Sequence, residues 1–243
     1  MQRFFVSRLP EMAGPVELPA DAAHHAMRVL RLSVGDRIVL FDGSGREWPA
    51  VISAISRHEV QVICETPVEV SRESPLRITL WQGISSGDRM DYTLQKAVEL
   101  GVARIVPLAC QRSVVKLAGE RADKRRQHWQ QLVVAACEQC GRNQVPEVGA
   151  VAGLEAILPV PADSLGLWMD PRAAQGLREL SVPLAGEIIL LAGPEGGFSP
   201  EEENLVRAAG FLAMRLGPRV LRTETAAVAA LSALQVLWGD LAG

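Results

Sequence analysis

The fold is indicated most directly by residues 187–203, EIILLAGPEGGFSPEEE. The apolar run that opens this stretch has the composition of a buried strand, and it ends in a glycine-rich loop. Ser199 then suits the N-cap of a helix, Pro200 its first position and Glu202 the acidic end of a capping box. A strand, a glycine loop and a helix in direct succession predict an α/β unit in which the loop backbone approaches a ligand closely.

The same alternation runs through the chain from residue 73 onward. Apolar runs of strand length alternate with segments whose apolar residues recur at helical spacing, and Gly101 suits the C-cap of one such helix. We expect strands at 76–84, 103–110, 164–170, 187–193 and 211–217, and helices at 89–101, 120–141, 199–210 and 223–241. Strands that alternate with helices predict a mostly parallel sheet that is covered on both faces.

Residues 1–72 have a different character. Short runs rich in Val and Ile are separated by turn signals such as Asp42-Gly43, and one helical stretch occupies 20–32. The polar segment SRESP at 71–75 is typical of a linker. We therefore expect two domains, a small β-barrel or sandwich at 1–72 and an α/β domain at 73–243.

The composition is that of an ordinary globular protein, with 243 residues, 48% hydrophobic and 22% charged residues and a net charge of −3. No run reaches the roughly 18–20 apolar residues that span a bilayer, and we expect no secretory signal. Four cysteines do not form a disulfide framework. We expect a cytoplasmic protein without a membrane segment, whose mild acidity argues against bulk adhesion to nucleic acid but allows a local basic face.

The charges around the glycine loop constrain its ligand. GPEGGF at 193–198 matches neither a Walker loop nor the G-x-G-x-x-G dinucleotide pattern. Glu195 and the glutamates at 201–203 would repel a polyphosphate, so we expect a neutral or cationic ligand. A second loop, LGPRVLRTETAA at 216–227, also leads from a strand into a helix. Two such loops at the carboxyl edge of one sheet predict a pocket walled by backbone, and tight connections without a ligand are the alternative.

Together these motifs resemble the RsmE-type RNA methyltransferases of the SPOUT superfamily. GPEGGFSPEE and LGPRVLRTETAA follow QKAVELG at 95–101 and EQCGRNQVPEV at 138–148, and MQRFFV and residues 24–45 are similar to that family's PUA-like RNA-binding domain. The resemblance covers nearly the whole chain. It implies a C-terminal α/β domain with a trefoil knot, a small N-terminal β-barrel, S-adenosylmethionine (SAM) as cofactor and a homodimer. It also implies methylation of N3 of a uridine in 16S ribosomal RNA, free or in the small ribosomal subunit.

The resemblance also assigns the cofactor pocket to the two loops. Much of the recognition would come from backbone groups, which explains the small residues. Ser86 departs from the family pattern, because a basic residue is expected there in many relatives. The cofactor-binding residues implied are Gly193, Pro194, Glu195, Gly196 and Gly197 in the first loop, and Leu216, Gly217, Leu221, Arg222, Thr223 and Glu224 in the second.

Methylation of a uracil nitrogen requires removal of the N3 proton or stabilisation of the charge that forms on the neighbouring carbonyl oxygens. A carboxylate can do the first and an arginine the second. Arg142 in the EQCGRN motif is the first candidate, with Glu138 one helical turn before it, and Arg222 and Glu224 come next. Without the motif, Glu138 and Arg142 would be an ordinary surface pair.

Basic residues in both parts of the chain are candidates for contacts with RNA phosphates, although such residues are usually solvated. The candidates are Arg3, Arg8, His25, Arg28 and Arg31 in the first domain, and Arg112, Lys124, Arg125 and Arg126 in the second. We expect no metal site, because Cys137 and Cys140 lack a second close pair of ligands and adjacent histidines diverge on a helix.

Other functions stay open on the sequence alone. A related SPOUT enzyme would methylate another RNA position or a ribose 2′-hydroxyl. A non-catalytic RNA-binding assembly factor would keep the fold without turnover. A nucleotide hydrolase is disfavoured, because no Gly-Lys-[Ser/Thr] follows the loop.

Overall fold

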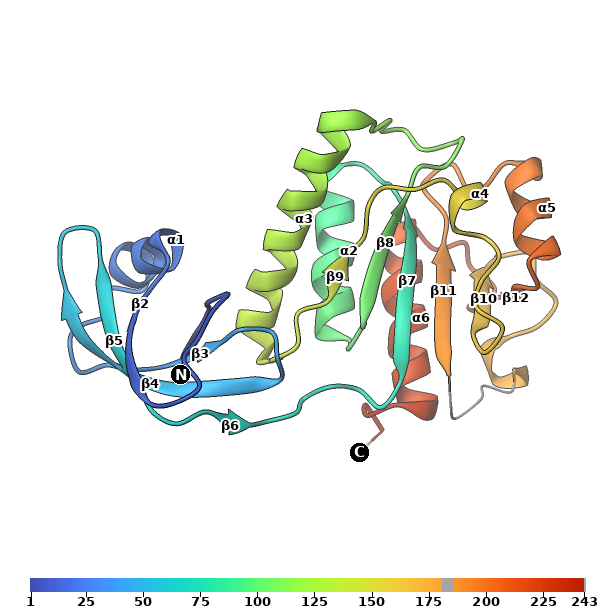
Figure 1. Cartoon of the computed structure of the whole chain (residues 1–243). Helices are drawn as coiled ribbons and strands as arrows, with labels where there is room; N and C mark the ends of the chain where they lie inside the picture. Colours follow the sequence, from blue (N-terminus) through green and yellow to red (C-terminus); the bar gives the residue numbers. More distant parts are fainter. Residues whose placement is uncertain (181–185, 243) are drawn as a thin grey trace. The chain divides into compact units, whose positions relative to one another are not determined.

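The computed structural model describes residues 1–180 and 186–242 (Figure 1). Contacts divide the chain into two compact units, Met1–Glu73 with Cys137–Val145, and Ser74–Ala136 with the chain from Pro146 onward. The sequence predicted a division after residue 72, and it did not predict that 137–145 belongs to the first unit. Each unit has its own sheet.

The first unit is a six-stranded sheet with one helical segment. Its elements are β1 (Gln2–Phe5), β2 (Gly14–Glu17), α1 (Ala20–His24), η1 (His25–Val29), β3 (Arg37–Phe41), β4 (Arg46–Ile55), β5 (Val60–Cys64) and β6 (Val68–Glu69). The strand order is β1-β3-β4-β5-β2, β6 pairs with β4, and β1 runs parallel to β3. Trp48, Phe4 and Ile38 are fully buried in its core. The expected β-rich domain with a helix near 20–32 is confirmed.

The second unit is an α/β fold. Its elements are β7 (Arg77–Gly83), α2 (Gly87–Glu99), β8 (Arg104–Leu108), α3 (Gly119–Cys140), β9 (Glu147–Val148), α4 (Leu154–Ile157), β10 (Leu165–Met169), η2 (Leu177–Glu179), β11 (Glu187–Ala192), α5 (Pro200–Ala208), β12 (Leu212–Met214) and α6 (Thr223–Trp238). The strand order is β12-β10-β11-β7-β8-β9, and every pair is parallel. The predicted parallel sheet is confirmed. The last residues of α3 are grouped with the first unit.

Both faces of this sheet are buried. Ile189 and Leu191 of β11 join a cluster with Leu154 of α4 and Val206 of α5. Side chains alternate along a strand, so the neighbouring Ile188 points to the opposite face, where it is also buried. The near-continuous apolar composition of the strand at 187–193 therefore has a simple cause, because neither face meets water.

The predicted strands and helices of the second unit all occur, with shorter strands than expected. The short elements β9, α4 and η2 were not predicted, because each spans too few residues to show a period. The trefoil knot implied by the resemblance stays a prediction. None of the helices in the described ranges is both long and apolar enough to cross a membrane.

Candidate functional site

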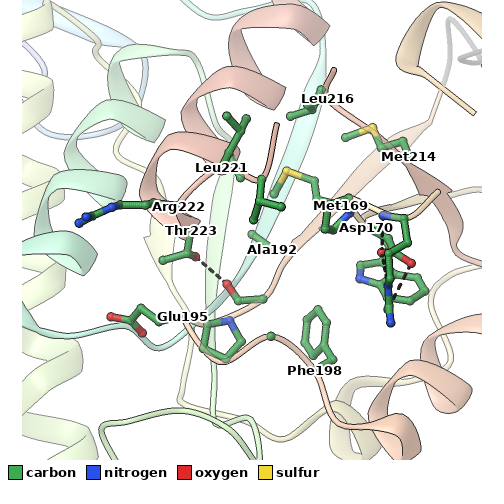
Figure 2. A pocket seen from close by; sticks show the side chains of 18 of the residues that line it. Met169, Asp170, Ala192, Glu195, Phe198, Met214, Leu216, Leu221, Arg222 and Thr223 are labelled. Atoms are coloured by element: carbon green, nitrogen blue, oxygen red, sulfur yellow. Dashed lines mark hydrogen bonds and ion pairs between the residues drawn. The ribbon is translucent and has the colours of Figure 1, made fainter. Parts of the chain in front are cut away.

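The candidate site lies at the carboxyl edge of the second sheet. A pocket of about 500 Å³ lies beside the ends of β10, β11 and β12 (Figure 2). Both predicted loops line it, and so does the segment that follows β10. The predicted cofactor residues in its lining are Gly193, Pro194, Glu195, Gly197, Leu216, Leu221, Arg222 and Thr223, whereas Gly196, Gly217 and Glu224 lie outside the lining.

Close backbone contact explains Gly83 at the end of β7 and Gly196 in the first loop. A Cβ atom on Gly83, the last residue of β7, would lie 2.4 Å from the nitrogen of Pro194. A Cβ atom on Gly196 would lie 2.8 Å from the carbonyl oxygen of Arg112. The first loop can lie here because its backbone packs directly against that of Gly83 and, at Gly196, against that of Arg112. Sequence reasoning missed Gly83, although a glycine at the end of a predicted strand was a usable signal.

Thr223 joins the two loops. Its Oγ1 donates a hydrogen bond to the carbonyl oxygen of Gly193 at 2.6 Å (Figure 2) and accepts one from Nε2 of Gln82 at 2.9 Å. Gln82 is fully buried, and its Nε2 also donates to the carbonyl oxygen of Gly83. These bonds hold the start of α6, the end of β7 and the first loop in one arrangement, so this wall of the pocket is preorganised.

The start of α5 is closed to an added anion. Ser199 Oγ accepts a hydrogen bond from the Glu202 amide at 3.2 Å, and the Ser199 amide donates to Glu202 Oε2 at 2.8 Å, which confirms the predicted capping box. Glu202 Oε1 accepts a further bond from the Gln111 amide. Of the glutamates expected to repel a polyphosphate, Glu202 is engaged here and Glu203 pairs with Arg172, whereas Glu201 is exposed. Phosphate is disfavoured because these amides are already bonded.

Asp170, directly after β10, is a lining residue that sequence reasoning missed. Its carboxylate is 3% exposed and lies 3.0 Å from Arg172 Nε and 3.5 Å from Arg207 Nη2. Arg172 Nη2 also lies 2.6 Å from Glu203 Oε1. These ion pairs fasten the wall at the end of β10 to α5. An acid directly after an apolar strand was the signal in the sequence.

Glu195 connects the first loop to the start of α2. Its Oε1 accepts hydrogen bonds from the Ser86 amide at 2.9 Å and the Ser86 hydroxyl at 3.1 Å, and Arg89 Nη1 lies 3.3 Å away. Burial raises the pKa of Glu195, but the bonds from Ser86 and the Arg89 cation outweigh burial, so this pKa lies below its ordinary value. Glu195 is therefore ionised at neutral pH. Its Oε2 is buried and has no hydrogen-bond partner in the described part of the chain.

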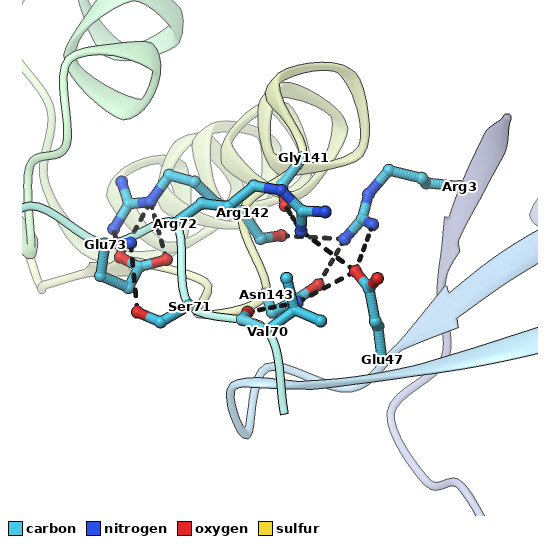
Figure 3. A network of polar contacts seen from close by, with 9 residues as sticks. All are labelled: Arg3, Glu47, Val70, Ser71, Arg72, Glu73, Gly141, Arg142 and Asn143. Atoms are coloured by element: carbon cyan, nitrogen blue, oxygen red, sulfur yellow. Dashed lines mark hydrogen bonds and ion pairs between the residues drawn. The ribbon is translucent and has the colours of Figure 1, made fainter. Parts of the chain in front are cut away.

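The EQCGRN segment belongs to the first unit, where its side chains form a polar network (Figure 3). Arg142 is 5% exposed, and its Nε donates to the two carboxylate oxygens of Glu73 at 3.2 and 3.0 Å. Glu138 Oε1 accepts a hydrogen bond from the Phe5 amide at 2.9 Å, and burial raises the pKa of Glu138. The two residues predicted to act together therefore each have a partner elsewhere in this unit.

Glu47 anchors the same network, and Glu47→Gln is expected to destabilise the protein at neutral pH. Its Oε2 accepts hydrogen bonds from Arg3, Arg72 and Asn143 at 2.8, 3.1 and 3.2 Å. Burial raises the pKa of Glu47, but these donors outweigh burial and lower it. A carboxylate with a lowered folded pKa stabilises the fold above its unfolded value, and this stabilisation is lost as pH falls through the folded pKa.

We therefore expect Glu47→Gln to lower the free energy of unfolding by about 1–2 kcal/mol at pH 7, with the difference fading in acid. Denaturant unfolding across pH measures it. The control is Glu65→Gln, because Glu65 is 54% exposed in a surface ion pair and should contribute less than about 1 kcal/mol. Equal losses in the two variants, or a difference that persists in acid, would contradict this account.

Cys137, the first cysteine of the C-x-x-C sequence, is not placed to act as a thiolate. Burial raises the pKa of Cys137 to about 12, so its thiol stays protonated. Cys140 is partly exposed at the end of α3. Within residues 1–180 and 186–242, no group of three or more His, Cys, Asp or Glu side chains is placed to hold a metal ion.

The basic candidates for RNA contact fall into four groups. Arg8, His25, Arg28 and Arg31 are exposed in the first unit. Arg3 is instead bound within that unit, with its side chain 10% exposed against Glu47. Lys124, Arg125 and Arg126 lie in the first half of α3, and Arg112 lines the pocket. Arg3 is therefore poorly placed to contact RNA phosphates.

A parallel α/β sheet whose loop backbones wall a pocket at its carboxyl edge is typical of enzymes that bind a small organic ligand. A family model described as an RNA methyltransferase domain matches residues 72–235, and one described as an RNA methyltransferase PUA domain matches residues 18–64. The chain belongs to the ribosomal RNA small subunit methyltransferase E family, since it is 33% identical to that protein of Buchnera aphidicola over 98% of this chain and 97% of the relative.

Solved structures agree with this assignment. The ribosomal RNA small subunit methyltransferase E of Neisseria gonorrhoeae, bound to SAM, is 44% identical, covers 99% of both chains and gives a TM-score of 0.93. A Legionella pneumophila protein described as a methyltransferase in complex with the bound cofactor SAM is 41% identical, covers 98% of both chains and gives a TM-score of 0.94.

Proposed function

We propose that this protein transfers a methyl group from SAM to N3 of a uridine in 16S ribosomal RNA. The observation that carries the proposal is the pocket walled by both glycine loops. Membership of a family whose named relatives act on small-subunit ribosomal RNA supports the substrate. The division of labour we propose follows the two domains, with RNA held by the first, at 1–72, and the chemistry carried by the second, at 73–243.

The residues present fit SAM. The pocket has the size of ordinary small-molecule sites, and Met169, Phe198, Met214 and Leu216 give it an apolar wall (Figure 2). The bonded amides at the start of α5 suit a ligand without phosphate. The buried, unpartnered oxygen of Glu195 suits a ligand with positive charge. The loop residues that line the pocket would hold the cofactor, largely through backbone groups.

SAM would supply an activated methyl group on a positively charged sulfur. The chain itself must align the acceptor nitrogen with that methyl group and stabilise the acceptor as it loses its proton. Fixed loops help to align the two substrates, because the hydrogen bonds of Thr223 and Gln82 hold the loops in place before any ligand enters. Arg222 is exposed at the N-cap of α6 and lines the pocket, and we propose that it contacts the acceptor uracil.

Participation of Arg142 and Glu138 in the reaction stays a prediction, and Arg142→Ala tests it. A direct role predicts that turnover is lost while SAM binding persists. If the ion pair between Arg142 and Glu73 serves only to support the fold, then Arg142→Ala and Glu73→Gln should each lower stability, and each variant should stay active once folded. Single-turnover assays, with calorimetry for SAM and thermal unfolding for stability, separate the two outcomes.

The basic run on α3 is proposed to contact RNA phosphates. We expect replacement of Lys124, Arg125 and Arg126 by glutamine to weaken RNA binding and to flatten its salt dependence by up to about 0.7–0.9 log units per phosphate contact removed. Binding titrations over a range of salt concentrations measure this slope. The control is Arg37→Gln, whose guanidinium is 63% exposed in a surface ion pair. An unchanged slope in the triple variant would exclude this surface.

We also propose that the protein is a homodimer, as the resemblance implies, and that it is cytoplasmic, as its few cysteines suggest. Val236 and Leu237 near the end of α6 are 51% and 39% exposed, which is consistent with a partner surface. Sedimentation as a monomer at micromolar concentration would contradict the dimer.

The activity is tested with isotopically labelled SAM and small ribosomal subunits that lack the modification. We expect label on N3 of one uridine in 16S RNA, and comparison with naked RNA shows which form is the substrate. Label on a ribose or on another base would replace the proposed acceptor. Absence of any transfer, together with absence of SAM binding by calorimetry, would favour an RNA-binding assembly factor.

A further inference from the structure

Arg89 is a cation at the start of a helix, where acidic side chains are ordinarily preferred. It lies in the first turn of α2, where the N-terminal end of the helix dipole disfavours a cation. It also lines the pocket, although it belongs to neither glycine loop. A residue that breaks a local rule beside a ligand pocket is a candidate for function.

Two carboxylates hold Arg89, one from each loop region. Arg89 Nη1 lies 3.3 Å from Oε1 of Glu195 in the first loop, and Arg89 Nε lies 3.9 Å from Oε1 of Glu224, the second residue of α6. Those two side chains are 18% and 16% exposed, whereas Arg89 is 41% exposed. The guanidinium is therefore oriented from its buried side and keeps N–H donors open on the other.

The other arginines of the lining are placed differently. Arg172 is bound by both Asp170 and Glu203. Arg112, which follows β8, is exposed, and Arg219 and Arg222 are exposed on the second loop. Arg89 differs from these arginines in two respects. Carboxylates from both loop regions orient its guanidinium, and some of its N–H donors stay open to the pocket. A donor that is fixed before the substrate arrives needs little reorganisation during reaction.

We propose that Arg89 donates hydrogen bonds to a carbonyl oxygen of the uracil and stabilises the negative charge that forms there. This inference rests on the proposed function. N3 loses its proton to water, and its lone pair forms the N–C bond to the methyl carbon as the carbon–sulfur bond breaks, with that electron pair left on sulfur. Arg89 lowers the free energy needed to remove the N3 proton, because it donates hydrogen bonds to the oxygen that becomes anionic. Glu195 and Glu224 are positioning residues that act through Arg89.

Arg89→Ala is the test, assayed in the full-length protein with saturating RNA and SAM. We expect turnover to fall about 100- to 1,000-fold, while the dissociation constant for SAM changes less than about threefold. The pH–rate profile should shift to higher pH, because the N3 proton is harder to lose without the cation. Added guanidinium ions should restore part of the rate. The control is Arg77→Ala, because Arg77 is 76% exposed at the start of β7 and away from the lining.

Wild-type turnover in Arg89→Ala would overturn the inference, and so would a slower variant whose pH profile stays unchanged. Failure of the wild type itself to methylate RNA would instead refute the proposed function, so the two failures are distinct. If Arg89→Ala does not fold, Arg89→Lys and Arg89→Gln are compared. The lysine variant is then expected to keep more activity than the glutamine variant, and equal activities would count against Arg89.

Discussion

Gly83→Ala is expected to abolish detectable SAM binding and to lower the free energy of unfolding by about 1–3 kcal/mol. The added Cβ would lie 2.4 Å from the nitrogen of Pro194, 2.5 Å from its Cδ and 2.8 Å from the carbonyl carbon of Gly193. No flexible side chain can move aside, because these are backbone and ring atoms. β7 and β11 are paired as far as Gln82 and Ala192. The strain must therefore displace the first loop, which is the wall of the pocket.

Isothermal titration calorimetry and thermal unfolding measure the two effects. Gly153→Ala is the matched control, since a Cβ there meets nothing within 4 Å and Gly153 has a φ of −84°. The control should bind SAM as the wild type does. If Gly83→Ala binds SAM within about threefold of the control, the close contact does not shape the pocket.

Thr223→Val is expected to weaken SAM binding by about 10- to 100-fold. Valine keeps the shape but removes Oγ1, which leaves the Gly193 carbonyl oxygen without its 2.6 Å donor and Gln82 Nε2 without its 2.9 Å acceptor. Each lost partner of a buried polar group costs about 1–3 kcal/mol. The first loop and the start of α6 are then no longer held together, so the pocket must be ordered by the ligand.

Thr223→Ser is the control, because serine keeps the hydroxyl and loses one methyl group. Calorimetry should give a dissociation constant close to that of the wild type for Thr223→Ser and a much larger one for Thr223→Val. Equal weakening in both would mean that packing of the methyl group, rather than the hydrogen bonds, sets the geometry of the loops.

Local sequence signals predicted the fold well where a few neighbouring residues decide the outcome. The capping box of Ser199 and Glu202 depends on four consecutive residues, and it is present. Gly101 ends α2 with a φ of 79°, as a C-cap glycine does. The parallel sheet followed from the alternation of apolar runs with helices, which is also a local pattern repeated along the chain.

The parts that were missed depend on residues far apart in the chain. The place of 137–145 in the first unit rests on Glu73 and Phe5, which no spacing links to Arg142 or Glu138. The composition of the pocket shows the same limit. Its loops were predicted from their own sequences, whereas Asp170 and Arg89 of the lining lie after β10 and in α2, which only the folded sheet brings to this edge. Gly83, which meets Pro194 of the first loop, lies at the end of β7.

The charge of the pocket shows a second limit of sequence reasoning. A count of glutamates predicted repulsion of phosphate, but Glu195, Glu202 and Glu203 are each engaged with a named partner. A formal charge in a sequence carries no information about which amide or arginine it will meet. That the site disfavours phosphate stays a prediction, which the bonded amides at the start of α5 also support.

The most direct test of the proposed function is nucleoside mass spectrometry of 16S ribosomal RNA from cells that lack this protein. We expect N3-methyluridine to disappear from one position, to return when the wild-type chain is supplied, and not to return with Gly83→Ala. Persistence of that modification in the deleted strain, or loss of a different methylated nucleoside, would contradict it.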